Sequence, residues 1–128
     1  MKIDTTFLNT LSEQAKVSPR LRQNYDLRTS DADTSQRMLN ALQPGTVVPI
    51  HRHKGSTETV ILIRGCVREV IFDDNGKEIE GIILNSETPM LQIPAGQWHT
   101  LEVIDPDSII FEAKDGAYQP LEASDIMQ

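Results

Sequence analysis

The feature that most constrains the fold is a series of short β-rich runs separated by turn signals. The clearest signal is Asp73-Asp74-Asn75-Gly76, because an Asn-Gly pair accepts the positive φ angles of a tight hairpin turn. The runs cover residues 36–42, 46–53, 58–64, 67–72, 77–84, 88–93, 99–104 and 108–114. About eight short strands at this spacing predict an all-β sandwich or barrel rather than an α/β fold.

An apolar stripe over residues 5–16 predicts one short N-terminal α-helix. Asp4 is a suitable N-cap for it. Pro19 ends the helix, because proline disfavours helical geometry in the residue before it. The polar, turn-rich segment 24–35 is expected to be mostly loop.

A chain of 128 residues has room for one domain. We expect three parts within it: an N-terminal helix and loop arm (1–35), a β-barrel (36–118) and a C-terminal tail (119–128). The longest apolar run, 60–63, is far too short to cross a membrane, and the N-terminus does not resemble a secretion signal. The single cysteine, Cys66, fits a reducing compartment, so a cytoplasmic location is expected.

The formal net charge of −7 disfavours two classes of partner. An acidic surface repels the phosphate backbone of nucleic acids, and it equally repels anionic lipid. We therefore expect no nucleic-acid and no membrane partner. A small molecule is the expected ligand.

All three histidines of the chain fall in two short clusters. His51 and His53 are two residues apart, so on a strand both project to the same face. A turn at residues 54–57 would bring Glu58 alongside them on the next strand. His99 comes from far along the chain, and only a closed barrel can deliver it to the same place. The four side chains are the predicted ligands of one divalent metal ion.

The two clusters resemble the two cupin motifs. Residues 45–65 match G-x5-H-x-H-x4-E-x6-G at every fixed position, and residues 94–99 match P-x-G-x2-H. Thr88 and Val103 stand where the second motif usually has glycine and asparagine, but neither is a metal ligand. The resemblance implies an all-β double-stranded β-helix, the cupin jelly-roll barrel, with the short N-terminal α-helix packed outside it.

The flanking segments 18–24, 37–42 and 112–118 are similar to those of the WbuC family of cupin metalloproteins. Members of that family are typically encoded beside genes for surface-polysaccharide (O-antigen) synthesis. This resemblance implies a carbohydrate-related role, although it does not name a reaction.

The donor set leaves the identity of the metal open. Nitrogen and oxygen donors without thiolate suit iron, manganese, nickel or zinc. An ion that prefers six ligands would keep two positions for water or substrate. Tetrahedral zinc would instead be closed by the same four side chains and would be structural.

Three arginines are candidates for holding an anionic group of the substrate: Arg20, Arg22 and Arg37. Their planar guanidinium groups bind carboxylate or phosphate through paired hydrogen bonds, and the alternative is a solvated surface. Glu112 and Tyr118 are the only side chains that suggest themselves as catalytic groups. For Tyr118, simple packing near the chain end is the alternative.

Two functional hypotheses follow. The first is a metal-dependent isomerase or epimerase, hydrolase or dioxygenase that acts on a small polar or anionic carbohydrate-related substrate in surface-polysaccharide biosynthesis. The second is a non-catalytic cupin that binds or senses a small molecule through its metal. In either case a homodimer is expected, by analogy with other small cupins.

Overall fold

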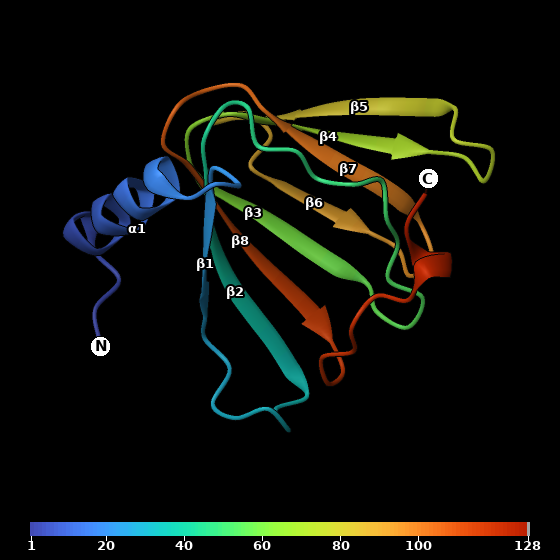
Figure 1. The fold of residues 1–128 in the computed structure, drawn as a ribbon, viewed down its shortest axis with the longest axis horizontal. Helices are drawn as coiled ribbons and strands as arrows, with labels where there is room; N and C mark the ends of the chain where they lie inside the picture. Colours follow the sequence, from blue (N-terminus) through green and yellow to red (C-terminus); the bar gives the residue numbers. More distant parts are fainter. Residues whose placement is uncertain (128) are drawn as a thin grey trace.

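The computed structural model describes residues 1–127, in which eight strands form two antiparallel sheets with one α-helix on the outside (Figure 1). The elements are α1 (Thr5–Val17), β1 (Arg22–Asp26), β2 (Ser35–Leu42), β3 (Glu58–Arg64), β4 (Val67–Phe72), β5 (Glu78–Leu84), β6 (Met90–Ile93), β7 (Trp98–Val103), β8 (Ser108–Asp115) and a 3-10 turn, η1 (Ala123–Asp125). The sheet orders are β1-β2-β8-β3-β6 and β5-β4-β7. The predicted all-β jelly-roll fold is confirmed.

Helix α1 forms and ends as the sequence predicts. The Asp4 carboxylate accepts a hydrogen bond from the Phe7 N–H at 3.0 Å and caps the first turn. The apolar stripe of the helix packs on the outer face of the five-stranded sheet, where Leu11 and Ala15 are buried against Leu39 and Ile109. No helix in the described residues is long and apolar enough to span a membrane.

Strand β8 shows how the two faces of the large sheet differ. Ile109 and Phe111 point outward into the cluster under α1, whereas Ile110 points inward into the core between the sheets. Further along the strand the inward positions become polar, with Glu112 and Lys114. The interior therefore changes from an apolar core to a polar pocket along one strand.

The prediction of a loop over residues 24–35 is wrong for residues 24–26, because β1 pairs along its whole length with β2. Tyr25 points outward and meets the Phe7 ring edge-on, with centroids 5.0 Å apart. Arg22 and Asn24 line the pocket. Both faces of β1 are thus partly polar, so it lacks the apolar alternation from which strands are recognised.

The expected strand at 46–53 is also absent, because this segment is irregular except for isolated bridges at His51. His51 exchanges two backbone hydrogen bonds with His99, of 3.0 and 2.9 Å, and so holds the segment along the free edge of β7 (Figure 1). Pro49 has no N–H to give to a ladder, which explains why the pairing does not extend. The C-terminal segment covers this region, since the Met127 N–H bonds to the Ile50 carbonyl at 2.8 Å.

Candidate metal centre

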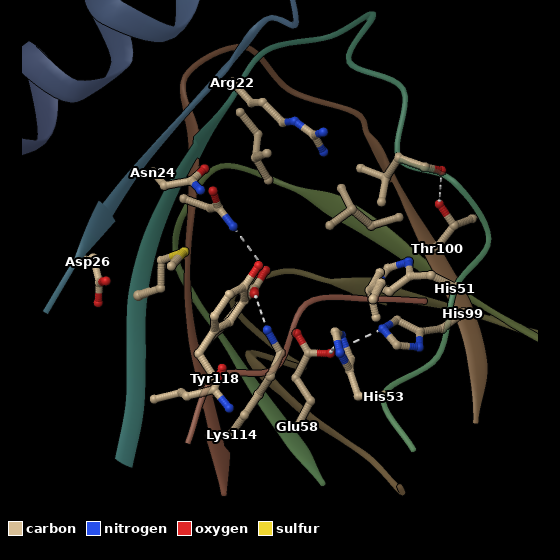
Figure 2. A pocket seen from close by; sticks show the side chains of 18 of the residues that line it. Arg22, Asn24, Asp26, His51, His53, Glu58, His99, Thr100, Lys114 and Tyr118 are labelled. Carbon is tan, nitrogen blue, oxygen red and sulfur yellow. Dashed lines mark hydrogen bonds and ion pairs between the residues drawn. The ribbon is translucent and has the colours of Figure 1, made fainter. Parts of the chain in front are cut away.

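Three imidazoles converge at one end of the pocket. One nitrogen from each of His51, His53 and His99 lies within 4.8 Å of the other two. Figure 2 shows the rings turned toward one another, His99 from β7 and His51 and His53 from the segment that precedes β3. The residues predicted from the motif are thus brought together, although His51 and His53 converge from a loop and not from a strand.

Backbone contacts fix the orientation of two of the rings. Nδ1 of His51 lies 2.8 Å from the Pro49 carbonyl oxygen, and Nδ1 of His99 lies 2.9 Å from the Gln97 carbonyl oxygen. A carbonyl only accepts, so each Nδ1 must carry the proton, and each neutral ring keeps its lone pair on Nε2. This is the arrangement by which proteins orient histidines that bind metals.

Glu58, the first residue of β3, completes the cluster. Its Oε2 lies 3.1 Å from Nε2 of His99 and 3.8 Å from Nε2 of His53. The residue is only 4% exposed, and within residues 1–127 its Oε2 has no hydrogen-bond partner. Two atoms that each bind one ion at about 2.1 Å are expected to lie roughly 3–4 Å apart. The orphaned oxygen and the imidazole nitrogens therefore fit a divalent metal ion.

The electrostatics of the cluster keep two imidazoles neutral. Burial, reinforced by His99, lowers the pKa of His51 to about 4. Burial and the nearby Lys114 lower the pKa of His53 to about 4. Both rings are therefore ready to bind a cation at neutral pH, with no proton to displace.

Glu58 and His99 behave as an ion pair. Burial opposes the charge on each of them, but their mutual attraction outweighs it. The pKa of Glu58 is lowered to about 2, and that of His99 is raised above its usual 6.5. Below its raised pKa, His99 must therefore release a proton before a metal ion can bind it.

This pattern predicts the pH dependence of metal binding. Protons compete with the metal for His99, so the Kd should rise about tenfold for each unit by which the pH falls between about 6.5 and about 5. The rise should steepen near pH 4, where His51 and His53 also take up protons. Titrating the metal-free protein with Zn²⁺ from pH 8 to pH 4 measures both slopes. A Kd that stays constant from pH 6.5 to pH 5 would contradict the assignment.

The metal centre opens into a pocket of about 490 Å³ whose wall also contains the three predicted arginines, Arg20, Arg22 and Arg37. Arg37 is tied to Asp33 by a 2.6 Å ion pair. Arg28 also lines the pocket, but Asp26 neutralises it at 2.7 Å. The structure therefore gathers these four arginines at the pocket and leaves their charges unequally compensated.

The two proposed catalytic side chains also line this pocket. Glu112 accepts a hydrogen bond from Nδ2 of Asn40 at 3.1 Å, and 13% of its side chain is exposed. Burial, with the charge of Glu58 next, raises the pKa of Glu112 to about 7. Tyr118 is 56% exposed at the pocket mouth, where the Arg28 guanidinium lies 5.4 Å from its ring centroid.

Among the polar residues of the pocket wall that sequence reasoning missed are Asn40, Glu69 and Lys114. Lys114 lies 3.5 Å from Glu112 and directly opposite Glu58 in the β3–β8 register. The signal that could have found these residues is strand alternation. Each occupies a position where its strand turns inward, although such positions normally hold apolar side chains.

Comparison with solved structures places the fold. Oxalate oxidase in complex with glycolate superposes with a TM-score of 0.65 at 16% identity, over 79% of this chain and 54% of that one. KdgF from Halomonas sp. gives 0.60 and 15%, over 80% and 85% of the two chains. The capsular polysaccharide assembling protein CapF from Staphylococcus aureus gives 0.67 and 20%, over 81% and 30%. The chain spans about half the length of the oxalate oxidase.

These neighbours share the cupin fold. That fold and the three-histidine cluster together support the assignment of this chain as a metal-binding cupin. Residues 3–84 match the family described as "Domain of unknown function (DUF6016)", so the chain belongs to this family. None of the curated proteins matches the sequence.

Proposed function

We propose that this protein is a metal-dependent enzyme that acts on a small anionic, carbohydrate-related substrate in surface-polysaccharide biosynthesis. The observation that carries the proposal is an unpaired guanidinium in the pocket of the metal centre. Arg22 is half-buried, and within residues 1–127 no carboxylate lies within 4.0 Å of its nitrogens. Figure 2 shows its side chain extending into the pocket from β1.

A substrate anion would supply the missing partner for Arg22. Burial, with repulsion from Arg20 next, lowers the pKa of Arg22, because both disfavour the charged guanidinium. A carboxylate or phosphate accepts two parallel hydrogen bonds from a guanidinium and would offset these effects. Arg20 would add attraction, and Arg37, which Asp33 already pairs, would add less.

The residues around the anchor suit proton transfer. A divalent ion held by His51, His53, His99 and Glu58 would supply Lewis acidity beside the bound substrate. Glu112 has a pKa near neutrality, so it can both take up and release a proton at working pH. We therefore favour isomerisation or epimerisation next to a carbonyl group, with Glu112 as the proton-transfer group and Tyr118 at the mouth as a hydrogen-bond donor.

Two likenesses support the biological setting. The segments flanking the cupin core are similar to the WbuC family, whose members accompany O-antigen genes. Among the structural neighbours, CapF is a capsular polysaccharide assembling protein. We extend this setting to the present chain, with a cytoplasmic location and a homodimeric state as parts of the same proposal.

The Arg22→Met variant tests the anchor. In zinc-loaded protein, we expect this change to weaken binding of sugar carboxylates and sugar phosphates by about 10- to 100-fold, the value of a charge-assisted hydrogen bond. Arg68→Met is the matched control, because Arg68 pairs with Glu78 and Glu102 away from the pocket. Isothermal titration calorimetry measures both, and equal effects of the two changes would contradict the proposal.

The same ligands distinguish an enzyme from a binding protein. Incubation with zinc-loaded protein in D₂O, followed by proton NMR, should show deuterium uptake next to a carbonyl or a change of configuration. Glu112→Gln should abolish this change while leaving binding in place. Binding of the whole panel without any conversion would favour the non-catalytic cupin.

A further inference from the structure

Buried oxygens without hydrogen-bond partners are concentrated in one place. Within residues 1–127 they are Asn40 Oδ1, Glu58 Oε2 and Glu69 Oε2. All three residues line the pocket of the metal centre. A metal ion would account for Glu58, but within residues 1–127 no group pairs with Asn40 Oδ1 or Glu69 Oε2.

Such groups are costly to keep. A buried polar atom without a partner loses its hydration and gains nothing in return, so native proteins rarely leave one. An apolar side chain at either position would avoid the cost, since the neighbouring inward residues Leu42 and Leu101 show that this interior accepts leucine. Two orphans in the wall of one pocket indicate that their partners arrive with a ligand.

The two residues face the pocket from different sheets. Asn40 lies on β2, where its Nδ2 already donates to Glu112, so Oδ1 is the atom left free to accept. Glu69 lies on β4, opposite Leu101 of β7 in the register, and is 1% exposed. A ligand between the sheets could therefore be held from both sides.

The charges of the pocket indicate which hydrogen-bond donor of a ligand would suit Asn40 and Glu69. An ammonium group would suit a free carboxylate, but Arg22, which has no carboxylate partner within residues 1–127, and Arg20 line the same pocket and would repel a further cation outside the metal centre. Burial, with Glu58 and Glu112 next, raises the pKa of Glu69 well above its usual value, which also weakens any attraction for a cation. A hydroxyl group both donates and accepts, so it satisfies Asn40 and Glu69 whichever protonation state Glu69 adopts.

We infer that Asn40 and Glu69 form a subsite for hydroxyl groups, so that the ligand of this pocket is a polyhydroxylated anion such as a sugar acid or sugar phosphate. The inference rests on the proposed function for the anion, which Arg22 would hold, and adds the hydroxyl-binding part. It assigns specificity to two residues that lie outside the cupin motifs.

Matched ligands test the subsite in zinc-loaded protein. D-Glucuronate should bind at least about 10-fold more tightly than cyclohexanecarboxylate, which keeps the ring and the carboxylate but has no hydroxyl group, since each hydrogen bond contributes about 1 kcal/mol. Asn40→Leu and Glu69→Met should abolish this preference and leave the affinity for cyclohexanecarboxylate unchanged. Equal binding of the two acids to the unmodified protein, or a preference that survives both changes, would overturn the inference.

A third probe separates this inference from the proposed function. Uncharged methyl β-D-glucopyranoside should bind weakly, and its binding should depend on Asn40 and Glu69 but not on Arg22. If only this sugar binds, the anionic part of the proposed function fails and the hydroxyl subsite stands. If both acids bind through Arg22 without a preference, the subsite fails and the proposed function stands.

Stability provides a test that needs no ligand. If Glu69 is kept for a ligand, Glu69→Met should raise the Tm of the metal-loaded protein, because it removes an unpaired polar group from the interior. Glu80→Met, at an exposed position on the neighbouring strand β5, is the control and should leave the Tm nearly unchanged. A Tm that falls in Glu69→Met alone would show that the carboxyl has a structural role and would overturn the inference.

Discussion

Replacing His51 or His53 by alanine is expected to weaken divalent-metal binding by more than about 100-fold without unfolding the barrel. Changes to groups that only orient a ligand already cost about 10- to 100-fold, and these changes remove a donor itself. The fold should persist because His51 is held to His99 by main-chain atoms, which alanine also provides. Competition with a chelator measures the Kd, and circular dichroism checks the fold.

Arg52→Ala is the matched control for the histidine variants. Arg52 lies between His51 and His53 in sequence, yet its guanidinium is 4.5 Å from the Trp98 ring centroid and 3.4 Å from Asp125. It therefore points away from the cluster, and its loss should leave the metal affinity within a few-fold of the original. Undiminished metal binding in both histidine variants would remove the site and every functional proposal that depends on it.

Gly65→Ala is expected to destabilise the protein by about 2–5 kcal/mol, which is a large part of the stability of a small domain. Gly65 has a φ of +89° in the turn between β3 and β4, a conformation that strains any residue with a Cβ. A Cβ built there would also lie 2.6 Å from the Cα of Ser108, which belongs to buried backbone at the start of β8. Backbone strain and overpacking should therefore add.

Gly116→Ala separates the two contributions. Gly116 has a similar φ of +78°, but a Cβ there would meet no atom within 4 Å. This control should therefore lose only about 1–2 kcal/mol, the cost of the left-handed conformation. Urea denaturation with comparable m values gives both free energies of unfolding. Equal losses in the two variants would show that the contact with Ser108 is unimportant.

Gly65 also closes the motif that contains His51, His53 and Glu58. The structure gives a physical reason for a glycine at this position, because the chain must reverse direction tightly against Ser108 between the two sheets. His51 and His53 precede β3 and Glu58 is its first residue, so these three donors lie at one end of the strand and the turn at Gly65 lies at the other. A motif of this kind thus combines residues that bind the ion with a residue that permits the barrel.

The helix and most of the strands could be predicted because local chemistry specifies them. Asp4 caps α1, Pro19 follows its end, and the Asn75-Gly76 pair lies in the turn between β4 and β5. The metal donors were also visible in the sequence, because His51, His53 and Glu58 are local neighbours in a motif. Signals of this kind depend on a few consecutive residues, so they can be recognised without knowledge of the fold.

Strand β1 and segment 46–53 could not be assigned correctly from the chain alone. β1 borders a polar pocket, so Arg22 and Asn24 occupy inward positions that the rule of apolar alternation reserves for hydrophobic residues. Segment 46–53 has β-rich composition, but its Pro49 cannot donate to a ladder and only His51 pairs with β7. In both places tertiary surroundings override local preference.

The amino-acid sequence by itself determined the class of fold, the helix and the candidate metal donors, because these follow from turn chemistry, capping and residue spacing. Only the tertiary structure decided which polar side chains share a pocket with the metal centre. Arg22, Asn40, Glu69 and Glu112 lie on four different strands of two sheets, and their meeting depends on the register between those strands. That register is set by packing across the whole barrel, which no short stretch of sequence encodes.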